Sequence, residues 1–306
     1  MQIGLEVEGG IVTGDGENYL REHLSDRWVI DSDPSVHVPN CYRQSAELKR
    51  KPFSIDKLGD VTGELENIFA LMKFNAGCGI HCHVSPDISD MSNPKKLAFM
   101  KNIVKLFYNN QELIYQLSGY QRRSSSYCLP LRHSQSVGSG QDIVKQVTTA
   151  KSCISLFSSL YSCDTSRTRQ ILSGQNAGNL RHRNGSTTRY LALNLLPILD
   201  SQTKTVEFRL LDSLDYNADR VSLLIKLLYK MVVGAKNKNK VRIFTKQRKV
   251  RLIDQQYKPV KRYNHKRLYE LLRSIDMLGD YQELKNHFRH SAQPLADTNN
   301  LTESNL

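Results

Sequence analysis

Three short segments, far apart along the chain, repeat one pattern in which two polar residues at positions i and i+2 alternate with apolar ones. The pairs are Glu6/Glu8, His81/His83 and Glu207/Arg209. Residues two apart on a β-strand share one face of the sheet. The pattern therefore predicts an antiparallel sheet whose apolar face carries helices and whose other face is polar and concave.

The rest of the chain predicts an α+β fold. Apolar residues at helical spacing indicate helices over residues 17–24, 56–73, 94–117, 142–161, 221–233, 265–277 and 280–290, with Asn217 as a capping residue. Further strands are expected over residues 28–33, 45–49 and 190–195, and a short hairpin over 242–256. We expect one domain over residues 1–290 and a disordered polar tail over 291–306.

Composition limits the class of protein. No apolar run is long enough to span a bilayer, and the N-terminus lacks the basic region of a signal peptide. Six cysteines without a CxxC pair are typical of reduced thiols, so we expect a cytoplasmic protein. The formal charge of +13, concentrated over residues 226–267, favours an anionic partner, although a solvated basic face would give the same excess.

The polar pairs form a candidate site if their faces coincide. Glu6 and Glu8 would then lie about 7 Å apart and, at an effective dielectric constant of about 20, repel each other by roughly 2.4 kcal/mol. Either solvent or a bound divalent cation can offset that repulsion. With Glu207 close by, and with Glu47 and Asp33 able to join, carboxylates outnumber softer ligands, which favours Mg²⁺ or Mn²⁺.

Zinc is the alternative metal, because two cysteines and two histidines crowd into one stretch: Cys78, His81, Cys82 and His83. Zinc needs its ligands on one side in tetrahedral geometry. On a strand, Cys82 points away from both histidines, which favours the carboxylate-bound ion.

The ordered set of motifs carries a family resemblance. Residues 77–85 (GCGIHCHVS) resemble the Gly-x-Gly-x-His-x-His-x-Ser strand of glutamine synthetases, residues 205–209 (TVEFR) their Glu-x-Arg strand, and residues 4–8 (GLEVE) their first Glu-x-Glu strand. Asp33 to Ser35 with Glu47, and Arg189 with Asn194, resemble further elements of the smaller amidoligase family in the same carboxylate–amine ligase superfamily. Departures are Lys49-Arg50-Lys51-Pro52, where the family usually has Ser-Pro, and residues 184–186, where glutamine synthetases have a second arginine.

The resemblance implies a glutamine synthetase-like catalytic domain that uses ATP and Mg²⁺ to join a carboxylate to an amine through an acyl phosphate. The implied metal ligands are Glu6, Glu8, Glu47, His81 and Glu207. The implied ATP- and substrate-binding residues are His83, Arg189, Asn194 and Asp33, the last also a candidate base. Arg209 would stabilise the phosphoryl group in transit, together with Glu207. The substrates would be small molecules or peptides, and the basic charge also fits an anionic or nucleic-acid-linked substrate.

Two other functions stay open at this point. A guanidino kinase-like phosphotransferase of the same superfamily would stop at phosphoryl transfer. A basic nucleic-acid-binding protein without catalysis would explain the charge of residues 226–267, where Tyr229, Phe244, Tyr257 and Tyr263 are interleaved with basic residues.

Overall fold

The computed structural model describes residues 1–118, 125, 128, 130–131, 147–161, 191–198, 204–212, 217–238 and 261–291. One antiparallel sheet has the strand order β2-β3-β1-β5-β7-β6, with β4 paired to the end of β1. The strands are β1 (Ile3–Ile11), β2 (Trp28–Asp31), β3 (Arg43–Phe53), β4 (Met72–Lys73), β5 (Gly79–Val84), β6 (Leu193–Asn194) and β7 (Val206–Asp212). The predicted α+β class with an antiparallel sheet is confirmed, and the sheet is open.

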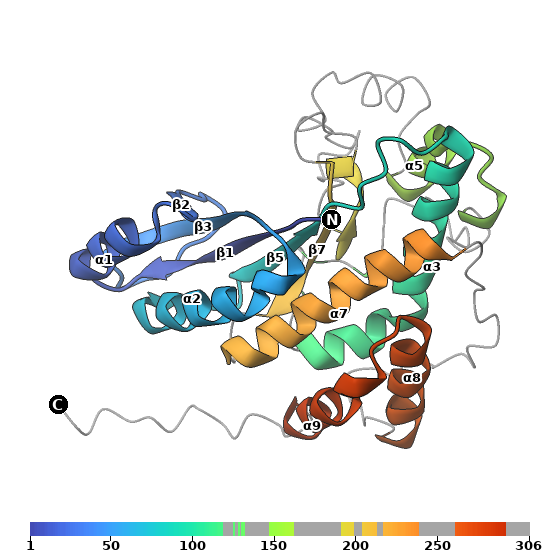
Figure 1. Ribbon diagram of the computed structural model, residues 1–306. Coiled ribbons are helices and arrows are strands. Elements are labelled where there is room, and N and C mark those ends of the chain that lie inside the picture. The colour runs from blue at the N-terminus through green and yellow to red at the C-terminus, as the bar shows by residue number, and fades with distance from the viewer. Residues whose placement is uncertain are drawn as a thin grey trace.

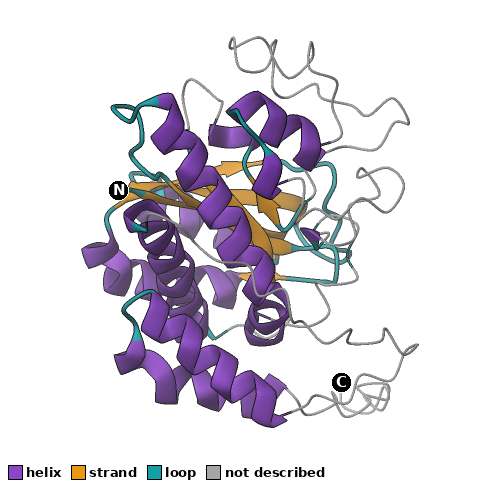
Figure 2. Cartoon of the chain, turned by 90° about the vertical axis from the view of Figure 1, so that its right-hand side faces the viewer, coloured by secondary structure: helices purple, strands orange, loops and turns teal. Residues whose placement is uncertain are grey.

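The described helices are α1 (Gly14–Leu24), α2 (Leu58–Leu71), α3 (Asn93–Ser118), α5 (Cys153–Tyr161), α7 (Ala218–Asn237), α8 (Lys261–Ser274) and α9 (Tyr281–Ser291), with short 3₁₀ turns at Ile55–Lys57, Leu196–Ile198 and Leu278–Asp280. Helices α1, α2, α3 and α7 pack on the apolar face of the sheet, and α5, α8 and α9 pack against α3. Figure 1 shows α2 and α7 side by side along one side of the strands, and α3 packs against α7 and β7. Seen from the right-hand side in Figure 2, a long helix crosses in front of the strands.

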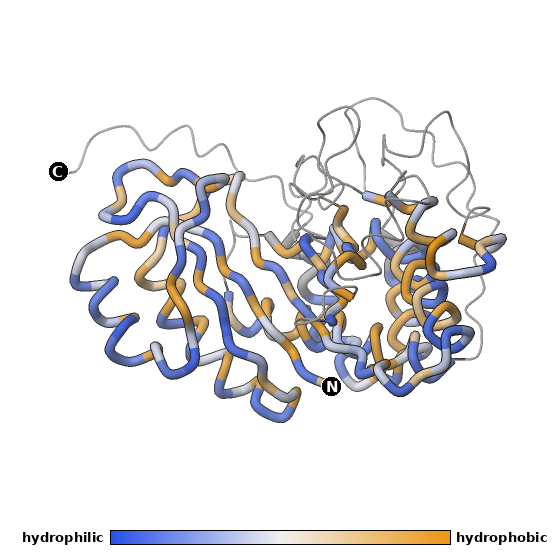
Figure 3. Tube along the Cα trace, turned by 90° about the horizontal axis from the view of Figure 1, so that it is seen from above, coloured by the Kyte–Doolittle hydropathy of each residue, from blue (hydrophilic) through white to orange (hydrophobic). Residues whose placement is uncertain are grey.

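The core lies between that helical layer and the sheet. Leu5, Val7, Cys82 and Phe208 point from the strands into it and are fully or almost fully buried. The ring of Phe107 on α3 meets the ring of Phe208 with centroids 6.1 Å apart. The alternation that produces this division can be followed along the strands in Figure 3, where hydrophobic and hydrophilic segments succeed one another.

A buried ion cluster joins β3 to α2 at the edge of this core. The Glu64 carboxylate accepts hydrogen bonds from Arg50 Nε at 2.7 Å, Trp28 Nε1 at 2.7 Å and Arg27 Nη1 at 2.8 Å. A carboxylate buried in this way needs paired charge and hydrogen bonds to be tolerated. Arg50, part of the departure from the family pattern, therefore has a structural role on the helical side of the sheet.

The end of β1 depends on two glycines for close packing. A Cβ atom on Gly10 would lie 2.7 Å from Cys41 Sγ and 2.8 Å from Val38 Cβ. A Cβ atom on Gly9 would lie 2.9 Å from the Lys73 carbonyl oxygen. Only glycine lets β4 and the segment around Val38 approach β1 this closely.

Several boundaries differ from those predicted. The predicted helix over 142–161 is interrupted, because Ala150 to Ser152 are not helical and Ser155 Oγ accepts hydrogen bonds from the backbone N–H groups of Lys151 and Ser152 at 3.0 Å each. The predicted strand over 45–49 extends to Phe53 across Pro52, which lies at a register shift where its missing N–H is not required. Of the strand predicted over 190–195, residues 191–195 are described, and within them β6 is limited to Leu193–Asn194.

Other expectations meet the structure only in part. The Asn217 cap is confirmed, since its side chain accepts a hydrogen bond from Arg220 N at 3.1 Å. Ser291 ends α9 instead of opening the tail, while the rest of the predicted tail and the predicted hairpin over 242–256 lie outside the described residues. Within the part of the chain that is described, no helix has the length and apolar character needed to cross a bilayer.

Candidate functional site

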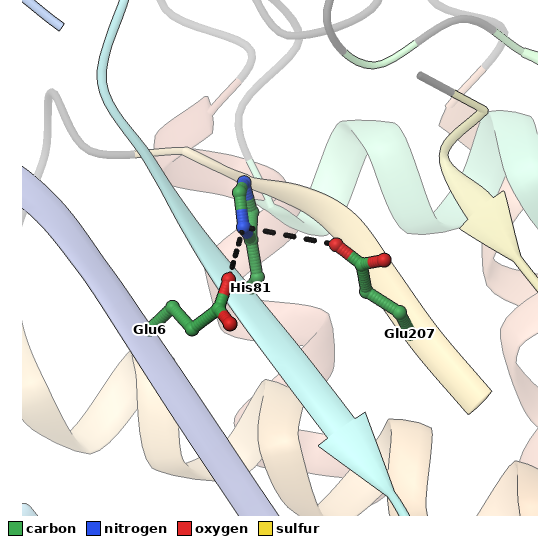
Figure 4. A group of neighbouring side chains, drawn as sticks. All are labelled: Glu6, His81 and Glu207. Carbon is green, nitrogen blue, oxygen red and sulfur yellow. Dashed lines mark hydrogen bonds and ion pairs between the residues drawn. The ribbon is translucent and has the colours of Figure 1, made fainter. Parts of the chain in front are cut away.

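Strand register brings the three polar pairs onto one face of the sheet. Glu6 on β1 is the Cα partner of His81 on β5, and His83 on β5 is the partner of Glu207 on β7. Directly paired residues in an antiparallel sheet project to the same side. Figure 4 shows the result: the side chains of Glu6, His81 and Glu207 converge from three adjacent strands.

A β-bulge on β7 interrupts the alternation of side chains between the two faces of the sheet. Cys82 pairs with Phe208 and Ile80 with Leu211, so one residue of β5 lies opposite two residues of β7. Leu210 and Leu211 are consequently both buried, although they are neighbours in sequence. The polar alternation of β7 ends at this bulge, which restricts its polar pair to Glu207 and Arg209.

His81 contacts two different sets of carboxylates through its two ring nitrogens. Its Nδ1 lies 2.9 Å from Glu6 Oε2 and 3.8 Å from Glu207 Oε1. Its Nε2 lies 3.4 Å from Glu8 Oε1. Two groups of ligand atoms, Glu6/His81/Glu207 and Glu8/Glu47/His81, each have all members within 4.8 Å of one another.

These residues fit a divalent cation. The imidazole of His81 is buried, yet its Nε2 has no hydrogen-bond partner among the described residues, a cost that a bound ion would remove. Glu8 and Glu47 are direct Cα partners on neighbouring strands, an arrangement that repels unless positive charge lies between the carboxylates. A set of carboxylate oxygens with one imidazole suits Mg²⁺ or Mn²⁺.

A hydrogen-bond chain fixes the orientation of Glu207. Tyr161 on α5 donates its hydroxyl to Asn194 Oδ1 at 3.1 Å, and Leu196 N donates to the same oxygen at 3.1 Å. The Asn194 amide must therefore present its Nδ2 to Glu207 Oε2, to which it donates at 2.6 Å. Arg209 donates to the other carboxylate oxygen of Glu207. Both oxygens of Glu207 are thus positioned by neighbours.

His83 lies beside the first group without being a member of it. Its Nε2 is 3.4 Å from Glu6 Oε1, and its Nδ1 is 3.1 Å from Thr205 Oγ1. Burial alone would lower the pKa of His83. The contact with Glu6 and the charge of Glu207 outweigh burial, so the pKa of His83 is above its ordinary value. A raised pKa favours the protonated imidazole, and a protonated imidazole at this position suits an anionic neighbour.

The carboxylates of the site divide into two classes. Burial alone would raise the pKa of Glu6 and Glu207, yet hydrogen bonds from His81 and His83 lower that of Glu6, and the charge of Arg209 lowers that of Glu207. Glu47 behaves in the opposite way, because burial and the charge of Glu6 raise its pKa despite the nearby Lys49. Glu47 is therefore the acidic ligand candidate that takes up a proton more readily than a free glutamate.

Lys49 brings a cation directly to the second group. Its Nζ lies 2.8 Å from Glu47 Oε2 and 2.9 Å from Asp31 Oδ2. Burial lowers its pKa, but the hydrogen bonds to Glu47 and Asp31 outweigh burial and raise the pKa above its ordinary value. The ammonium is therefore charged throughout the physiological range.

Not every residue predicted for the site joins it. Asp33 accepts hydrogen bonds from Ser35 N at 2.8 Å and Ser35 Oγ at 2.7 Å within its own turn, and it belongs to neither group of ligand atoms. Arg189 lies outside the described residues. Asn194 is at the site, where its described contacts hold Glu207.

The four residues considered for zinc do not share a side. Cys82 is the Cα partner of Leu5 and Phe208 and faces the core, where burial raises the pKa of its thiol well above the ordinary value. Cys78 is fully buried in a separate apolar cluster with Val36, Val38 and Cys41. The two histidines alone face the carboxylates.

The described part of the basic segment has intramolecular partners. Lys226 Nζ lies 2.7 Å from Asp280 Oδ1, and Arg267 donates to the Asn109 carbonyl oxygen at 2.9 Å. Lys236 donates to the Asp87 carbonyl oxygen at 2.9 Å. Residues 239–260, which hold much of the basic excess, lie outside the described residues.

Three residues at or near the site were missed in the sequence: Tyr161, Thr205 and Lys49. Lys49 lies two residues after Glu47 on the same strand, and Thr205 lies two residues before Glu207, just ahead of β7. The i, i+2 rule could therefore have identified both. Tyr161 gave no such signal, because it reaches Asn194 from a helix on a different part of the chain.

Comparison with known proteins supplies one match. A family model described as "Putative amidoligase enzyme" matches residues 7–232, well over half of the chain. No curated protein and no solved structure matches at the threshold used.

Proposed function

The chain belongs to the amidoligase family, and on that premise we propose that it is an ATP-dependent carboxylate–amine ligase with a glutamine synthetase-like catalytic domain over residues 1–290. The observation that carries the proposal is the convergence of Glu6, His81 and Glu207 from three strands, with ligand atoms within 4.8 Å of one another, next to Arg209. Ligase chemistry of this kind needs a cation site and a fixed positive charge beside it.

The proposed metal ligands are Glu6, His81 and Glu207 in one group and Glu8 with Glu47 in the other, and a Mg²⁺ ion held there would neutralise phosphate charge and orient the γ-phosphate. Arg209, partly buried against Glu207, is proposed to stabilise negative charge that develops on the transferred phosphoryl group. His83 carries a raised pKa and is proposed to face the nucleotide phosphates. Asn194 positions Glu207 and does not itself need to touch substrate.

The proposed reaction has two steps. First, a carboxylate oxygen of one substrate attacks the γ-phosphorus of ATP, the bond to the β–γ bridging oxygen breaks, and ADP leaves with that electron pair. An amine then attacks the acyl carbon, loses a proton and expels inorganic phosphate, so that the amide, ADP and phosphate are the products. The protein supplies binding, orientation and charge stabilisation and needs no nucleophile of its own.

The test is a substrate screen with purified full-length protein. Panels of amino acids, short peptides and polyamines are incubated pairwise with Mg²⁺ and ATP, phosphate release is measured, and products are identified by mass. We expect phosphate release that requires both a carboxylate and an amine, with a product lighter by one water than the sum of the two substrates.

Product identity separates this function from the alternatives. A phosphorylated acceptor and ADP without free phosphate would instead assign a phosphotransferase. ATP-independent, steeply salt-dependent binding of nucleic acid, with no turnover across the panels, would contradict the ligase and favour a binding protein. Arg209→Lys tests the role of the guanidinium separately from its charge. The variant keeps the positive charge but loses the planar guanidinium, and it should retain only a small part of the turnover.

A further inference from the structure

Gly4 lies in the interior of β1, on the polar face of the sheet. It precedes Glu6 by two residues, and its Cα partner on β5 is His83. Residues two apart on a strand share one face, so a side chain at position 4 would project beside those of Glu6 and His83. A glycine inside a strand often marks a bulge or a place where a ligand or another backbone approaches closely.

The fold itself does not require glycine at this position. The φ angle of Gly4 lies outside the left-handed region, so the backbone conformation suits other residues equally well. A Cβ atom on Gly4 would lie 3.6 Å from His83 Cβ and 3.9 Å from the Arg50 carbonyl oxygen, and both are ordinary van der Waals contacts. Gly9 and Gly10 on the same strand differ, because a Cβ atom on either would meet a neighbour at 2.8 Å or less.

A bulge lies opposite Gly4 but does not use the glycine. Between the Ile3–Phe53 pair and the Leu5–Arg50 pair, β1 advances by two residues and β3 by three. The extra residue therefore belongs to β3, and Gly4 is on the regular strand. Once strain, close packing and the bulge are set aside, the approach of a ligand to the β1 backbone is the explanation that remains.

The imidazole opposite Gly4 points to a ligand independently. His83 Nδ1 lies 3.1 Å from Thr205 Oγ1, which leaves Nε2 for another partner. This Nε2 is buried and makes no hydrogen bond to the described residues, although Glu6 Oε1 lies 3.4 Å away. Buried polar atoms are nearly always hydrogen-bonded, so the free nitrogen indicates that a ligand group completes the site. Gly4 and His83 thus mark the same part of the polar face.

We propose that Gly4 is a specificity-determining position, where the absence of a side chain lets the phosphate chain of ATP lie against β1 beside His83. The inference rests on the proposed function, because it places the nucleotide of that site. Residues two apart on a strand are separated by about 7 Å, so phosphates that extend from the metal group along β1 pass over Gly4. Glu6 and Glu8 carry carboxylates that repel phosphate, whereas Gly4 is uncharged and leaves the His83 nitrogen accessible to a phosphate oxygen.

Gly4→Ala tests the proposal because the fold has room for the added methyl group and the proposed phosphates do not leave room. Overfilling a packed site by one methyl group should weaken binding about tenfold or more. Alanine restricts the unfolded chain more than glycine does, so the variant should not lose stability. Gly63→Ala is the matched control: Gly63 lies at an exposed position on α2, where a Cβ atom would have open space within the described structure.

The experiment is isothermal titration calorimetry of the full-length protein with ATP and, separately, with inorganic tripolyphosphate, both in excess Mg²⁺. Gly4→Ala should bind each ligand about tenfold or more weakly than the wild type does. Gly63→Ala should bind both ligands like the wild type. Without ligand, the thermal midpoint of Gly4→Ala should equal that of the wild type or exceed it by about 1–2 °C.

Four results overturn the proposal. The first is an equal affinity of Gly4→Ala and the wild type for ATP, and the second is an equal loss of affinity in Gly63→Ala. The third is affinity for ATP but not for tripolyphosphate, or a loss confined to ATP, which would place the nucleoside over Gly4 instead of the phosphates. The fourth is a thermal midpoint of Gly4→Ala several degrees below that of the wild type, which would show that the fold needs this glycine.

A failure of the proposed function has a different signature. If the wild type bound neither ATP nor tripolyphosphate at millimolar concentration, the nucleotide site itself would be contradicted, and this inference with it. If the wild type bound both ligands and Gly4→Ala bound them equally well, the nucleotide site would stand and only the role of Gly4 would be contradicted.

Discussion

Glu6 and His81 are direct Cα partners on β1 and β5, and the imidazole Nδ1 lies 2.9 Å from the Glu6 carboxylate. This one cross-strand pair connects both ligand groups, because the opposite nitrogen of the same ring is directed at Glu8. His83, two residues along β5, contacts Glu6 through its Nε2 at 3.4 Å but belongs to neither group. The two histidines therefore have separable roles.

Metal binding should distinguish His81 from His83. His81→Ala removes a donor from both ligand groups and should weaken Mn²⁺ binding at least about 100-fold, whereas His83→Ala should weaken it by less than about tenfold. Isothermal titration calorimetry of the two metal-free variants checks this. Equal losses from both substitutions would contradict the assignment of His81 as the shared ligand.

Replacing Glu207 or Arg209 should abolish turnover. Glu207→Ala removes a proposed metal ligand and the anchor of Arg209, and Arg209→Ala removes the charge beside the transferred group, so we expect each to lower Mg²⁺-dependent ATP turnover about 10³-fold or more. Phosphate release with the substrates found in the screen is the measurement, and circular dichroism verifies folding. Full activity in both variants would falsify the proposed function.

Asn194 should act through Glu207. Asn194→Ala removes the Nδ2 donor that lies 2.6 Å from Glu207 Oε2 and should lower kcat about 10- to 100-fold, with the KM for ATP changed far less. Tyr161→Phe removes the next hydrogen bond in the chain and should have a smaller effect on kcat, because Leu196 N still donates to Asn194 Oδ1. A raised KM with unchanged kcat in Asn194→Ala would instead indicate direct substrate contact.

The metal-free site should be electrostatically strained. Glu8 is buried and directly opposite Glu47, and like charges in that arrangement destabilise a sheet by up to about 1 kcal/mol. Glu8→Gln should therefore raise the thermal midpoint of the metal-free protein by about 2 °C and remove part of the stabilisation that added Mg²⁺ gives the wild type. Glu66→Gln, at an exposed position on α2, is the matched control and should leave both quantities unchanged.

Metal binding should weaken in mild acid. The pKa of Glu47 is raised above its ordinary value of 4.5 by burial and by the charge of Glu6, so this carboxylate takes up a proton at a higher pH than a free glutamate. Because an ion needs the deprotonated form, the affinity of the Glu8/Glu47 group for an ion should fall as the pH falls through that raised pKa, while Glu6 and Glu207, with lowered pKa values, stay ionised. Mn²⁺ titrations between pH 5 and pH 7.5 check this, and Glu47→Gln should flatten the dependence.

The same raised pKa has a consequence for stability. The folded protein holds a proton on Glu47 more tightly than the unfolded chain does, so protonation favours the folded state. The metal-free protein should therefore lose stability from this group as the pH rises through the raised pKa, in the direction opposite to the contribution of Glu6. Urea unfolding of the wild type and Glu47→Gln at matched pH values separates this contribution from the rest.

Local pattern was sufficient to predict much of the fold. Strict alternation around Glu6, His81 and Glu207 predicted the strands and their polar face, because side-chain direction in a strand depends only on position parity. Helical periodicity predicted α2, α3 and α7, and Asn217 predicted the start of α7. The antiparallel sheet was predicted from the same alternation, because strands that are apolar on one face and polar on the other are typical of antiparallel sheets.

Boundaries were less predictable where short-range and long-range forces compete. The break at Ala150 to Ser152 depends on hydrogen bonds of Ser155 that compete with the helix, and the passage of β3 through Pro52 depends on a register shift opposite β1. Neither feature follows from residue propensities over a short window. The two leucines buried in succession on β7 likewise depend on a bulge that is defined only by the pairing with β5.

For the site, the sequence by itself determined which residues carry the chemistry: the carboxylates, the imidazoles and the guanidinium at i, i+2 spacing. Tertiary structure alone decided that Glu6 meets His81, that Asn194 holds Glu207, and that Lys49 pairs with Glu47. The reason is physical: parity fixes the face on which a side chain lies, but strand order and register fix which side chains on that face are neighbours.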